Sequence, residues 1–249
     1  MADKELGGRV ALVTGAGRSI GRAIAIELAS AGAAVVVNVR SNTAVADAVV
    51  KEIEAAGGRA LAAIADVTDA AAVQAMADAA LKTFGRIDYL VNNAALRQEK
   101  SIEQMTFEDW RTITGVILDG AFHCVKVCLE AIKKSDAGSI VNVGGLSGAL
   151  GAYDRVHVVT AKAGIAGFTR GLARELSPHR ITVNTLVPGM LAKPGKPDEM
   201  PSHPIYRPLL GRAAFPTDMA TTVRFLLGPG ARYITGQTIN VSGGSHFGA

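Results

Sequence analysis

Short apolar runs alternate with segments of helical periodicity along most of this 249-residue chain. The first two runs, Arg9–Thr14 and Ala34–Val39, read RVALVT and AVVVNV, and such continuous apolar runs are typical of parallel strands buried on both sides. The segments between the runs are long enough for crossover helices, and repeated strand–helix–strand units give right-handed connections. The sequence therefore predicts an α/β fold with a doubly wound parallel sheet and helices on both faces.

The alternation extends over a single predicted domain, residues 1–249. About seven strands are expected, at residues 9–14, 34–39, 60–65, 87–92, 139–143, 181–186 and 238–241. Helices are expected at 20–31, 44–56, 70–84, about 106–134, about 158–176 and about 217–227. One segment, at about 188–212, breaks the pattern because six prolines fall between Pro188 and Pro208. It is expected to be a substrate lid or, alternatively, a mobile surface loop.

Charge and cysteine usage exclude several classes of protein. The net charge is +4, and the lysines and arginines are scattered rather than clustered, so neither a nucleic-acid nor a membrane partner is expected. No apolar run approaches transmembrane length and the first residues lack a signal-peptide core, which predicts a cytoplasmic protein. Cys124 and Cys128 lie one helical turn apart without nearby ligand residues, so packing is favoured over a metal site or a disulfide, and no metal site is predicted.

A glycine-rich turn follows the first predicted strand. Thr14–Gly21 reads TGAGRSIG, and glycines at such a turn let the backbone approach a pyrophosphate that lies on a helix N-terminus. Later strands end in further characteristic stretches, namely Asp66-Val67, Asn92–Ala95, Val187–Gly189 and Val241–Gly244. Taken together, these stretches are far more specific than a glycine-rich turn alone.

On these residues the chain resembles the short-chain dehydrogenase/reductase family over essentially its whole length, and it is similar to the β-ketoacyl-ACP reductase branch. The resemblance implies a Rossmann-type fold, NAD(P) as the cofactor, and tetramers built partly through the helices that start near Ile117 and Val158. It implies that Asp66 lies beside the adenine and Asn93 near the cofactor ribose. The positions that would bind the cofactor, if binding is retained, are Gly15, Arg18, Ser19, Ile20, Gly21, Arg40, Asp66, Val67, Asn93 and Lys162.

Three departures from the family pattern fall where the cofactor would lie. Ser19 and Ala95 stand at family glycine positions, and each added side chain occupies space that a cofactor needs. Lys193 aligns with a threonine that usually holds the nicotinamide amide. We therefore expect this chain to bind no NAD(P), or to bind it weakly.

The nucleotide preference follows from the end of the second strand. Val39 stands where NAD-dependent enzymes have the acidic residue that binds the adenosine ribose. Arg40 follows it and Arg18 lies in the glycine-rich turn, so both could face a 2′-phosphate. This favours NADP if a dinucleotide binds. The alternative interpretation is two solvent-exposed arginines.

The residues that the family uses for proton transfer are mostly replaced. The family pairs a tyrosine with a lysine four residues later, on one helix face, so that the lysine lowers the phenol pKa. A serine thirteen residues before the tyrosine polarises the substrate oxygen, and an asparagine holds a water beside the lysine. Lys162 matches the lysine, but Val158, Gly145 and Ile117 stand at the tyrosine, serine and asparagine positions. The resemblance thus implies an incomplete catalytic set.

Two nearby polar residues are the candidates for a relocated site. Tyr153 lies in the loop before the lysine helix, and Ser147 is two residues from the serine position. The alternative is that both are ordinary polar loop residues and that Lys162 is kept for packing. His157 adjoins Val158 but is rotated by about 100° around the helix axis, so we expect its ring to point elsewhere.

These losses favour a non-catalytic subunit of a heteromeric NAD(P)-dependent dehydrogenase, paired in a tetramer with a homologous active chain that holds NAD(P). The family contains such heteromers, for example the two-subunit 2-[hydroxy(phenyl)methyl]-succinyl-CoA dehydrogenase of anaerobic toluene breakdown, which would suggest a β-hydroxyacyl-CoA substrate. A first alternative is an active NADP-dependent carbonyl reductase or alcohol dehydrogenase with relocated acid/base residues. A second is a dinucleotide-sensing scaffold protein.

Overall fold

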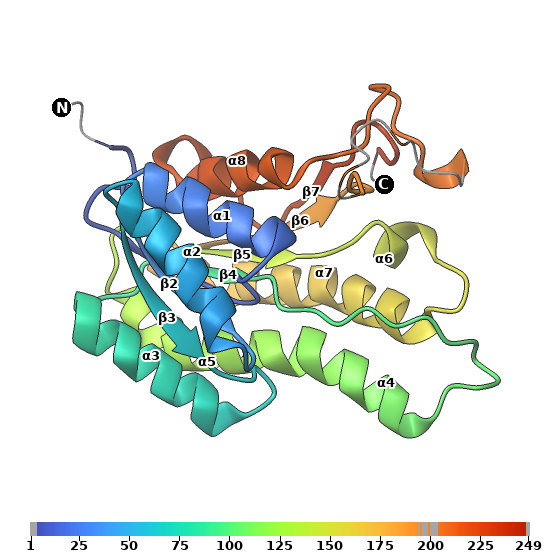
Figure 1. Ribbon diagram of the computed structural model, residues 1–249, viewed down its shortest axis with the longest axis horizontal. Coiled ribbons are helices and arrows are strands. Elements are labelled where there is room, and N and C mark those ends of the chain that lie inside the picture. Colours follow the sequence, from blue (N-terminus) through green and yellow to red (C-terminus); the bar gives the residue numbers. More distant parts are fainter. Residues whose placement is uncertain (1–3, 194, 196–198, 200–203, 248–249) are drawn as a thin grey trace.

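A computed structural model describes residues 4–193, 195, 199 and 204–247 of the chain. It contains one seven-stranded sheet, all parallel, in the order β3-β2-β1-β4-β5-β6-β7 (Figure 1). The strands are β1 (Val10–Val13), β2 (Ala34–Val39), β3 (Arg59–Ile64), β4 (Tyr89–Asn92), β5 (Ser139–Val143), β6 (Thr182–Pro188) and β7 (Thr238–Val241). The doubly wound parallel sheet predicted from the apolar runs is confirmed, with every predicted strand in place.

Helices cover both faces of the sheet. They are α1 (Ser19–Ser30), α2 (Thr43–Ala55), α3 (Ala70–Phe84), α4 (Phe107–Thr114), α5 (Gly120–Lys133), α6 (Ser147–Leu150), α7 (Val156–Leu176) and α8 (Pro216–Leu227). The apolar faces of α1, α2 and α8 share one core cluster, and those of α3, α5 and α7 share another, so the sheet separates two layers of helices (Figure 1). The central strands are buried on both faces for this reason, and most of the partly exposed strand residues lie in the edge strands β3 and β7.

The predicted helix at 106–134 is continuous but not uniform. A π-helical segment, Gly115–Asp119, joins α4 to α5, and sequence periodicity did not predict it. The whole run Phe107–Lys133 is long and apolar enough to cross a membrane by length and composition, with a mean hydropathy of 1.4 in its most apolar window. Here its apolar side packs in the protein core, with Cys124 and Cys128 buried as free thiols, as the interpretation of this pair as packing residues predicted. Burial raises the pKa of Cys124 to about 12.

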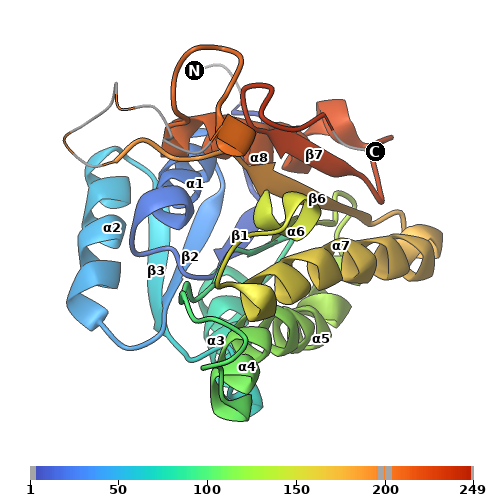
Figure 2. The same cartoon turned by 90° about the vertical axis from the view of Figure 1, so that its right-hand side faces the viewer.

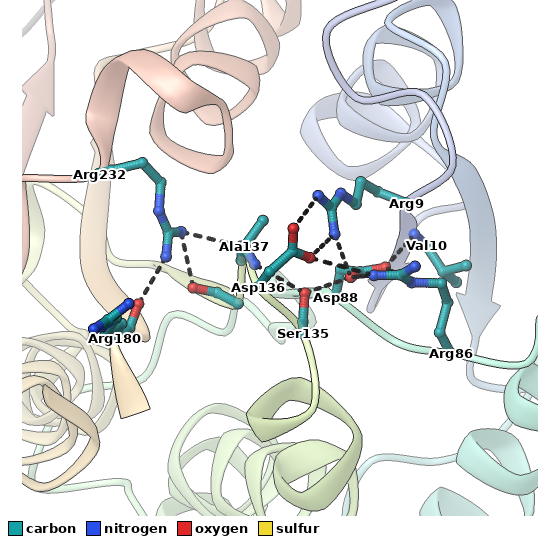
Figure 3. Close-up of polar contacts among 10 residues, drawn as sticks. Arg9, Val10, Arg86, Asp88, Ser135, Asp136, Ala137, Arg180 and Arg232 are labelled. Atoms are coloured by element: carbon teal, nitrogen blue, oxygen red, sulfur yellow. Dashed lines mark hydrogen bonds and ion pairs between the residues drawn. The ribbon is translucent and has the colours of Figure 1, made fainter. Parts of the chain in front are cut away.

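The amino edge of the sheet is closed by charged side chains (Figure 3). Asp88 is fully buried and accepts hydrogen bonds from the backbone N–H of Val10 (2.9 Å), from Arg86 Nε (2.8 Å) and from the Ser135 hydroxyl. Arg9 joins this group and pairs with the exposed carboxylate of Asp136. Further along the same edge, Arg232 donates to the carbonyl oxygens of Ala137, Gly138 and Arg180.

The carboxyl edge is where a ligand site is expected. The chain passes from β1 outwards to β2 and β3 on one side, and then crosses to β4 on the other side of β1. In sheets of this topology ligands bind outside the strand ends at that switch point. Figure 2 faces this edge, with α6 next to α7 near the middle of the view. The glycine-rich turn, Asn93 and Gly145 all follow strands that end here.

The proline-rich segment at about 188–212 lies partly outside the described residues. Of its described part, Leu191 forms an isolated bridge with Ala214, and Pro204–Tyr206 is a short 3₁₀ helix. The Tyr206 hydroxyl donates to the carbonyl oxygen of Gly151 at 2.7 Å, which ties this segment to the end of α6. Its role as a lid stays a prediction.

Candidate functional site

The glycine-rich turn after β1 lies directly against the end of β4. Gly15 has a φ of +61°, and a Cβ there would lie 3.0 Å from Ala94 Cα. A Cβ at Gly21 would lie 2.3 Å from the carbonyl oxygen of Gly15, closer than any side chain can approach. Both positions therefore require glycine, because the turn folds back on itself and on its neighbour strand.

Asn93 ties this turn to the sheet. Its Nδ2 donates to the carbonyl oxygens of Thr14 (2.9 Å) and Gly15 (3.1 Å), while the backbone N–H groups of Asn93 and Ala94 donate to Thr14 Oγ1 at 2.9 and 3.0 Å. The resemblance implies a position near the cofactor ribose. In the structure the Asn93 amide forms hydrogen bonds to the backbone of the turn, so this side chain stabilises the shape of the turn.

Asn38 in β2 also forms a hydrogen bond to the turn. The sequence analysis did not identify this residue. Its buried Oδ1 accepts from the N–H of Gly15 (3.3 Å), and its Nδ2 donates to the carbonyl oxygens of Ala63 (3.2 Å) and Ala65 (3.0 Å). The available signal was one amide side chain inside the otherwise apolar run of β2, since buried polar groups need hydrogen-bond partners.

The N-terminus of α1 remains open. No side chain caps it, and its first turn contains no acidic residue. Ser19 begins the helix with a φ of +49°, so the serine keeps the left-handed conformation that glycine adopts readily, and its side chain is exposed. An uncapped helix N-terminus with exposed N–H groups attracts an anion such as a pyrophosphate.

Beside this turn, Arg18 and Arg40 are both exposed, and neither forms an ion pair with any residue in the described part of the chain. Val39 is buried and contacts the turn, because a Cβ at Gly17 would lie 2.8 Å from Val39 Cγ1 and 2.6 Å from Val45 Cγ1. This part of the site thus offers two cations and no carboxylate at the end of β2.

Asp66 and Val67 follow β3 as predicted, but they differ in exposure. The Asp66 Oδ1 accepts from the backbone N–H (2.9 Å) and the hydroxyl (2.8 Å) of Thr68. Val67 is buried, and its side chain packs on α5, where a Cβ at Gly120 would lie 2.6 Å from Val67 Cγ2. Asp66 is partly exposed and can contact a ligand, whereas the Val67 side chain packs in the core.

Lys162 lies in α7 beside the end of β5. Its Nζ donates to the carbonyl oxygen of Val143 at 2.7 Å, and burial lowers its pKa to about 8. A Cβ at Gly145 would lie 3.5 Å from Lys162 Cγ and 3.8 Å from Ser147 Oγ, which are ordinary contacts. The structure therefore brings Lys162, Gly145 and Ser147 together, and a Cβ at position 145 would fit.

Ile117 and Val158, the residues at the asparagine and tyrosine positions, belong to one apolar cluster. They are 3% and 7% exposed and share the cluster with Ile113, Ala121, Ala161 and Ile165. Ile117 comes from the π-helical segment, and such segments often occur at functional sites. The two replacements are thus packed in one cluster, and the space between α7 and this segment is filled by hydrocarbon.

The remaining sequence candidates lie at the edges of the site. Tyr153 is 88% exposed. His157 is fully buried, and neither ring nitrogen has a hydrogen-bond partner among the described residues. Ala95 is exposed, and Lys193 forms an ion pair with Glu199, so neither fills a buried gap.

A separate pocket of about 550 Å³ opens past the ends of β6 and β7. It is lined mainly by apolar residues, including Met190, Leu209, Leu210 and Phe247, with an Asn240 oxygen that has no partner among the described residues. Lys162 and Ser147 are not part of its lining, so any proton transfer by Lys162 would take place outside this pocket.

Known proteins resemble the chain over almost its whole length. The family model described as Enoyl-(Acyl carrier protein) reductase matches residues 15–246. A 3-oxoacyl-[acyl-carrier-protein] reductase of Synechocystis sp. is 41% identical over 95% of this chain and 96% of its own length. The 3-oxoacyl-[acyl-carrier-protein] reductase FabG of Staphylococcus aureus is 38% identical, over 95% and 98%.

Solved structures match equally well. A short-chain dehydrogenase from Burkholderia cenocepacia in complex with NADP has a TM-score of 0.89 and 33% identity, covering 97% of this chain and 99% of its own. A blue fluorescent protein from a metagenomic library in complex with NADPH has a TM-score of 0.90 and 32% identity, covering 98% and 100%.

These relatives correct the expected function. The interpretation as a non-catalytic subunit is wrong, because relatives at 38–41% identity over nearly the full chain are named as reductases. That interpretation treated each missing polar group as a loss, whereas Ile117 and Val158 pack together and Lys162 keeps a lowered pKa at the strand ends. A homologous partner chain and a tetramer stay predictions. The chain belongs to the short-chain dehydrogenase/reductase family.

Proposed function

We propose that this chain is an active NADP-dependent carbonyl reductase, able to run in reverse as an alcohol dehydrogenase, with acid/base groups moved from the family positions. The observation that carries the proposal is Lys162, a partly buried residue whose amine donates to the carbonyl oxygen of Val143 at the carboxyl edge of the sheet and has a lowered pKa. A lysine retained only for packing would leave a charge buried at a cost, since desolvation disfavours the ammonium form.

The cofactor site fits a dinucleotide with a 2′-phosphate. Gly15 and Gly21 form the tight turn, the open N-terminus of α1 suits a pyrophosphate, and Arg18 and Arg40 supply unpaired positive charge for a further phosphate. Solved relatives that contain NADPH or NADP support the same choice. A reduced nicotinamide bound at this edge would supply a hydride.

The substrate class follows from the relatives named as 3-oxoacyl-[acyl-carrier-protein] reductases, and we propose a 3-oxoacyl thioester. The chain's own residues would hold the ketone oxygen near Lys162 and Ser147. The apolar cluster of Ile117 and Val158 excludes water behind them. The 2-[hydroxy(phenyl)methyl]-succinyl-CoA identification adds no residue to this site and stays a prediction.

Two measurements test the proposal. Calorimetry of the purified chain should give micromolar or tighter NADPH binding, and NADPH oxidation should depend on acetoacetyl-CoA as a model 3-oxoacyl thioester. Arg40→Ser should weaken NADPH binding by about tenfold, since an exposed charge-assisted contact is worth roughly 1 kcal/mol or more, whereas Arg174→Ser, an exposed arginine near the end of α7, should not.

Other outcomes would favour other functions. Absence of turnover by the purified chain would contradict the reductase. Tight NADPH binding without turnover would favour the dinucleotide-sensing scaffold, which stays a prediction. Weak NADPH binding would contradict the proposed cofactor site, and it would be the result expected if Ser19, Ala95 and Lys193 obstruct the cofactor.

A further inference from the structure

Lys162 carries its charge without a counter-ion. Its Nζ has one hydrogen bond, to the carbonyl oxygen of Val143, and forms no ion pair within the part of the chain that the structure describes. A buried ammonium usually needs a carboxylate beside it, because its desolvation is otherwise uncompensated. Here the amine is held by a backbone oxygen that can accept a hydrogen bond from either its charged or its neutral form.

The elements packed against α7 confirm that the amine is electrostatically isolated. Strands β5 and β6 and the short helix α6 contain no charged residue. Helix α4 and the π-helical segment contribute the charged residues Glu108, Asp109, Arg111 and Asp119, and the 3₁₀ turn after α7 contributes His179. None of these lowers the pKa of Lys162, which falls to about 8 through burial alone. Asp109 is held by Lys100 at 2.6 Å.

Gly145 and Ser147, in and after the turn that follows β5, are partly exposed, as is Lys162. Gly145 has no side chain, and the position of its missing Cβ is 3.5 Å from Lys162 Cγ and 3.8 Å from Ser147 Oγ. Helix α6 packs closely against α7 near Lys162, since a Cβ at Gly148 would lie 2.8 Å from the backbone nitrogen of Ala163. Ser147, the first residue of α6, is thereby fixed next to Lys162.

Other proton donors are poorly placed. Tyr153 is 88% exposed in the turn before α7. His157 is enclosed in the protein, and Val158 has replaced the phenol one helical turn before the lysine. Of these candidates, Ser147 is the one that the fold places beside Lys162, since its Oγ and Lys162 Cγ both lie within 4 Å of the position of the missing Gly145 Cβ.

We propose that Lys162 Nζ is itself the proton donor to the ketone oxygen, with Ser147 Oγ as the second hydrogen-bond donor to that oxygen. This inference rests on the proposed reductase function and names the groups that carry out its proton transfer. In the related reductases, by the resemblance, the lysine acts through a tyrosine. Here Gly145 and Val158 have no exchangeable proton, so the lysine would donate its proton directly to the substrate.

The reaction balances with groups already named. Reduction forms a C–H bond from the hydride that the reduced nicotinamide supplies, and the two electrons of the C=O π bond move onto oxygen. The oxygen then takes a proton from Lys162, so that one N–H bond breaks and one O–H bond forms. The neutral amine keeps its hydrogen bond to Val143 and regains a proton from solvent. In alcohol oxidation the neutral amine accepts the proton instead.

A lysine with a pKa near 8 is suited to this role, because a general acid works best when its pKa lies near the working pH. Below pH 8 the ammonium is the major form and can donate. Reduction should therefore be fastest below pH 8 and fall by about tenfold per pH unit above it. The reverse oxidation should rise over the same range.

Variants of Lys162 test the assignment with NADPH and acetoacetyl-CoA as probes. Lys162→Arg keeps the charge and a hydrogen-bond donor but cannot release its proton near neutral pH. It should lower kcat by about 10²-fold or more, as should Lys162→Met, because loss of a general acid typically costs 10²–10⁴-fold. Lys82→Met, an exposed lysine in α3, is the matched control and should leave kcat unchanged.

Rescue experiments separate a proton donor from a structural lysine. Lys162→Ala should regain activity when methylammonium or ethylammonium is added, since a small amine can occupy the space and donate the proton. Ser147→Ala should lower kcat by about tenfold while the pH midpoint remains that of Lys162. A lysine needed only for packing would show no rescue.

A further measurement does not depend on turnover. The dimethylamino group of ¹³C-methylated Lys162, assigned by its absence in Lys162→Arg, should titrate near pH 8 in the cofactor-free chain. Titration above pH 10, or wild-type kcat in Lys162→Arg, would overturn the proton-donor role and leave the reductase function standing. No turnover by the wild-type chain would overturn both.

Discussion

At the scale of single residues, the site keeps its backbone geometry where its side chains have changed. Ser19 retains the positive φ of a glycine position, and Gly145 leaves room for a side chain that is absent. Asn93 and Asn38 hold the glycine-rich turn by hydrogen bonds to its backbone. The turn is therefore maintained by residues other than the ones that differ from the family pattern.

Ser19→Gly should stabilise the protein. A non-glycine residue in the left-handed region costs about 1–3 kcal/mol, and the greater freedom of glycine in the unfolded chain offsets part of the gain. We expect the free energy of unfolding in urea to rise by about 1 kcal/mol. Ser30→Gly, at the other end of α1 in ordinary helical conformation, should instead lower it by about 0.5–1 kcal/mol. A destabilising Ser19→Gly would contradict the strain.

Lys162 should also make stability depend on pH. Its pKa is about 8 in the folded chain against 10.5 for an ordinary lysine, so between these values the unfolded chain binds more protons and stability rises with pH. The charged form costs about 3 kcal/mol below pH 8. Lys162→Met should remove this rise and increase the free energy of unfolding at pH 7. Lys82→Met should retain the wild-type pH dependence, and a flat wild-type profile would contradict the lowered pKa.

At the scale of elements, the chemistry depends on how α6 and α7 meet the end of β5. Helix α7 presents positions 158 and 162 on one face, one turn apart. Residue 145 lies in the turn that follows β5, next to the aliphatic part of the Lys162 side chain. Because α7 packs against the π-helical segment, the surroundings of Val158 are apolar.

Restoring the family pair on this framework should increase activity. In Gly145→Ser/Val158→Tyr the serine has ordinary contacts and the tyrosine shares a helix face with Lys162, although a larger residue at a buried position costs about 1–3 kcal/mol. We expect kcat for acetoacetyl-CoA to rise by at least about tenfold. Val156→Tyr, on the exposed side of α7, should have no such effect. An unchanged kcat in the double variant, with the fold intact by circular dichroism, would contradict this geometry.

At the scale of the whole molecule, the two edges of the sheet are built differently. The amino edge is closed by a buried carboxylate, Asp88, which joins β1, β4 and the chain before β5. The carboxyl edge carries an uncapped helix N-terminus, Lys162, and two exposed arginines that form no ion pair with the described residues, and it is where we propose that ligands bind. Stability and function are thus assigned to opposite ends of the same strands.

Asp88→Asn should destabilise the entire domain. Asp88 is buried, and its carboxylate accepts from the Val10 N–H, the Ser135 hydroxyl and two partly exposed arginines, so weakening these hydrogen bonds should cost about 1–3 kcal/mol. Asp136→Asn should cost much less, because its carboxylate is exposed. The hydrogen bond from Arg9 lowers the pKa of Asp136 to about 2, so its contribution is present above pH 4 and lost as the pH falls towards 2. Urea unfolding of both variants at pH 7 measures the difference; equal losses would contradict the role of burial.

The expected tetramer also belongs to this scale. Sedimentation of the purified chain, alone and mixed with a homologous reductase chain, tests both the assembly and the predicted partner. A monomer in both samples would contradict these two predictions while leaving the reductase proposal intact.

The sequence by itself predicted a doubly wound parallel sheet of about seven strands and the residues that stand at the family's proton-transfer positions. Apolar runs such as β1 and β2 report burial directly, and motif spacing locates Lys162 and Val158 on one helix face. The tertiary structure decided what surrounds those residues. Three features depend on contacts between distant segments: the apolar cluster that holds Ile117 and Val158, the place of Ser147 beside Lys162, and the lack of a counter-ion for the lysine among the described residues. Spacing along the chain does not encode such contacts, and the charge of a buried amine is set by what surrounds it.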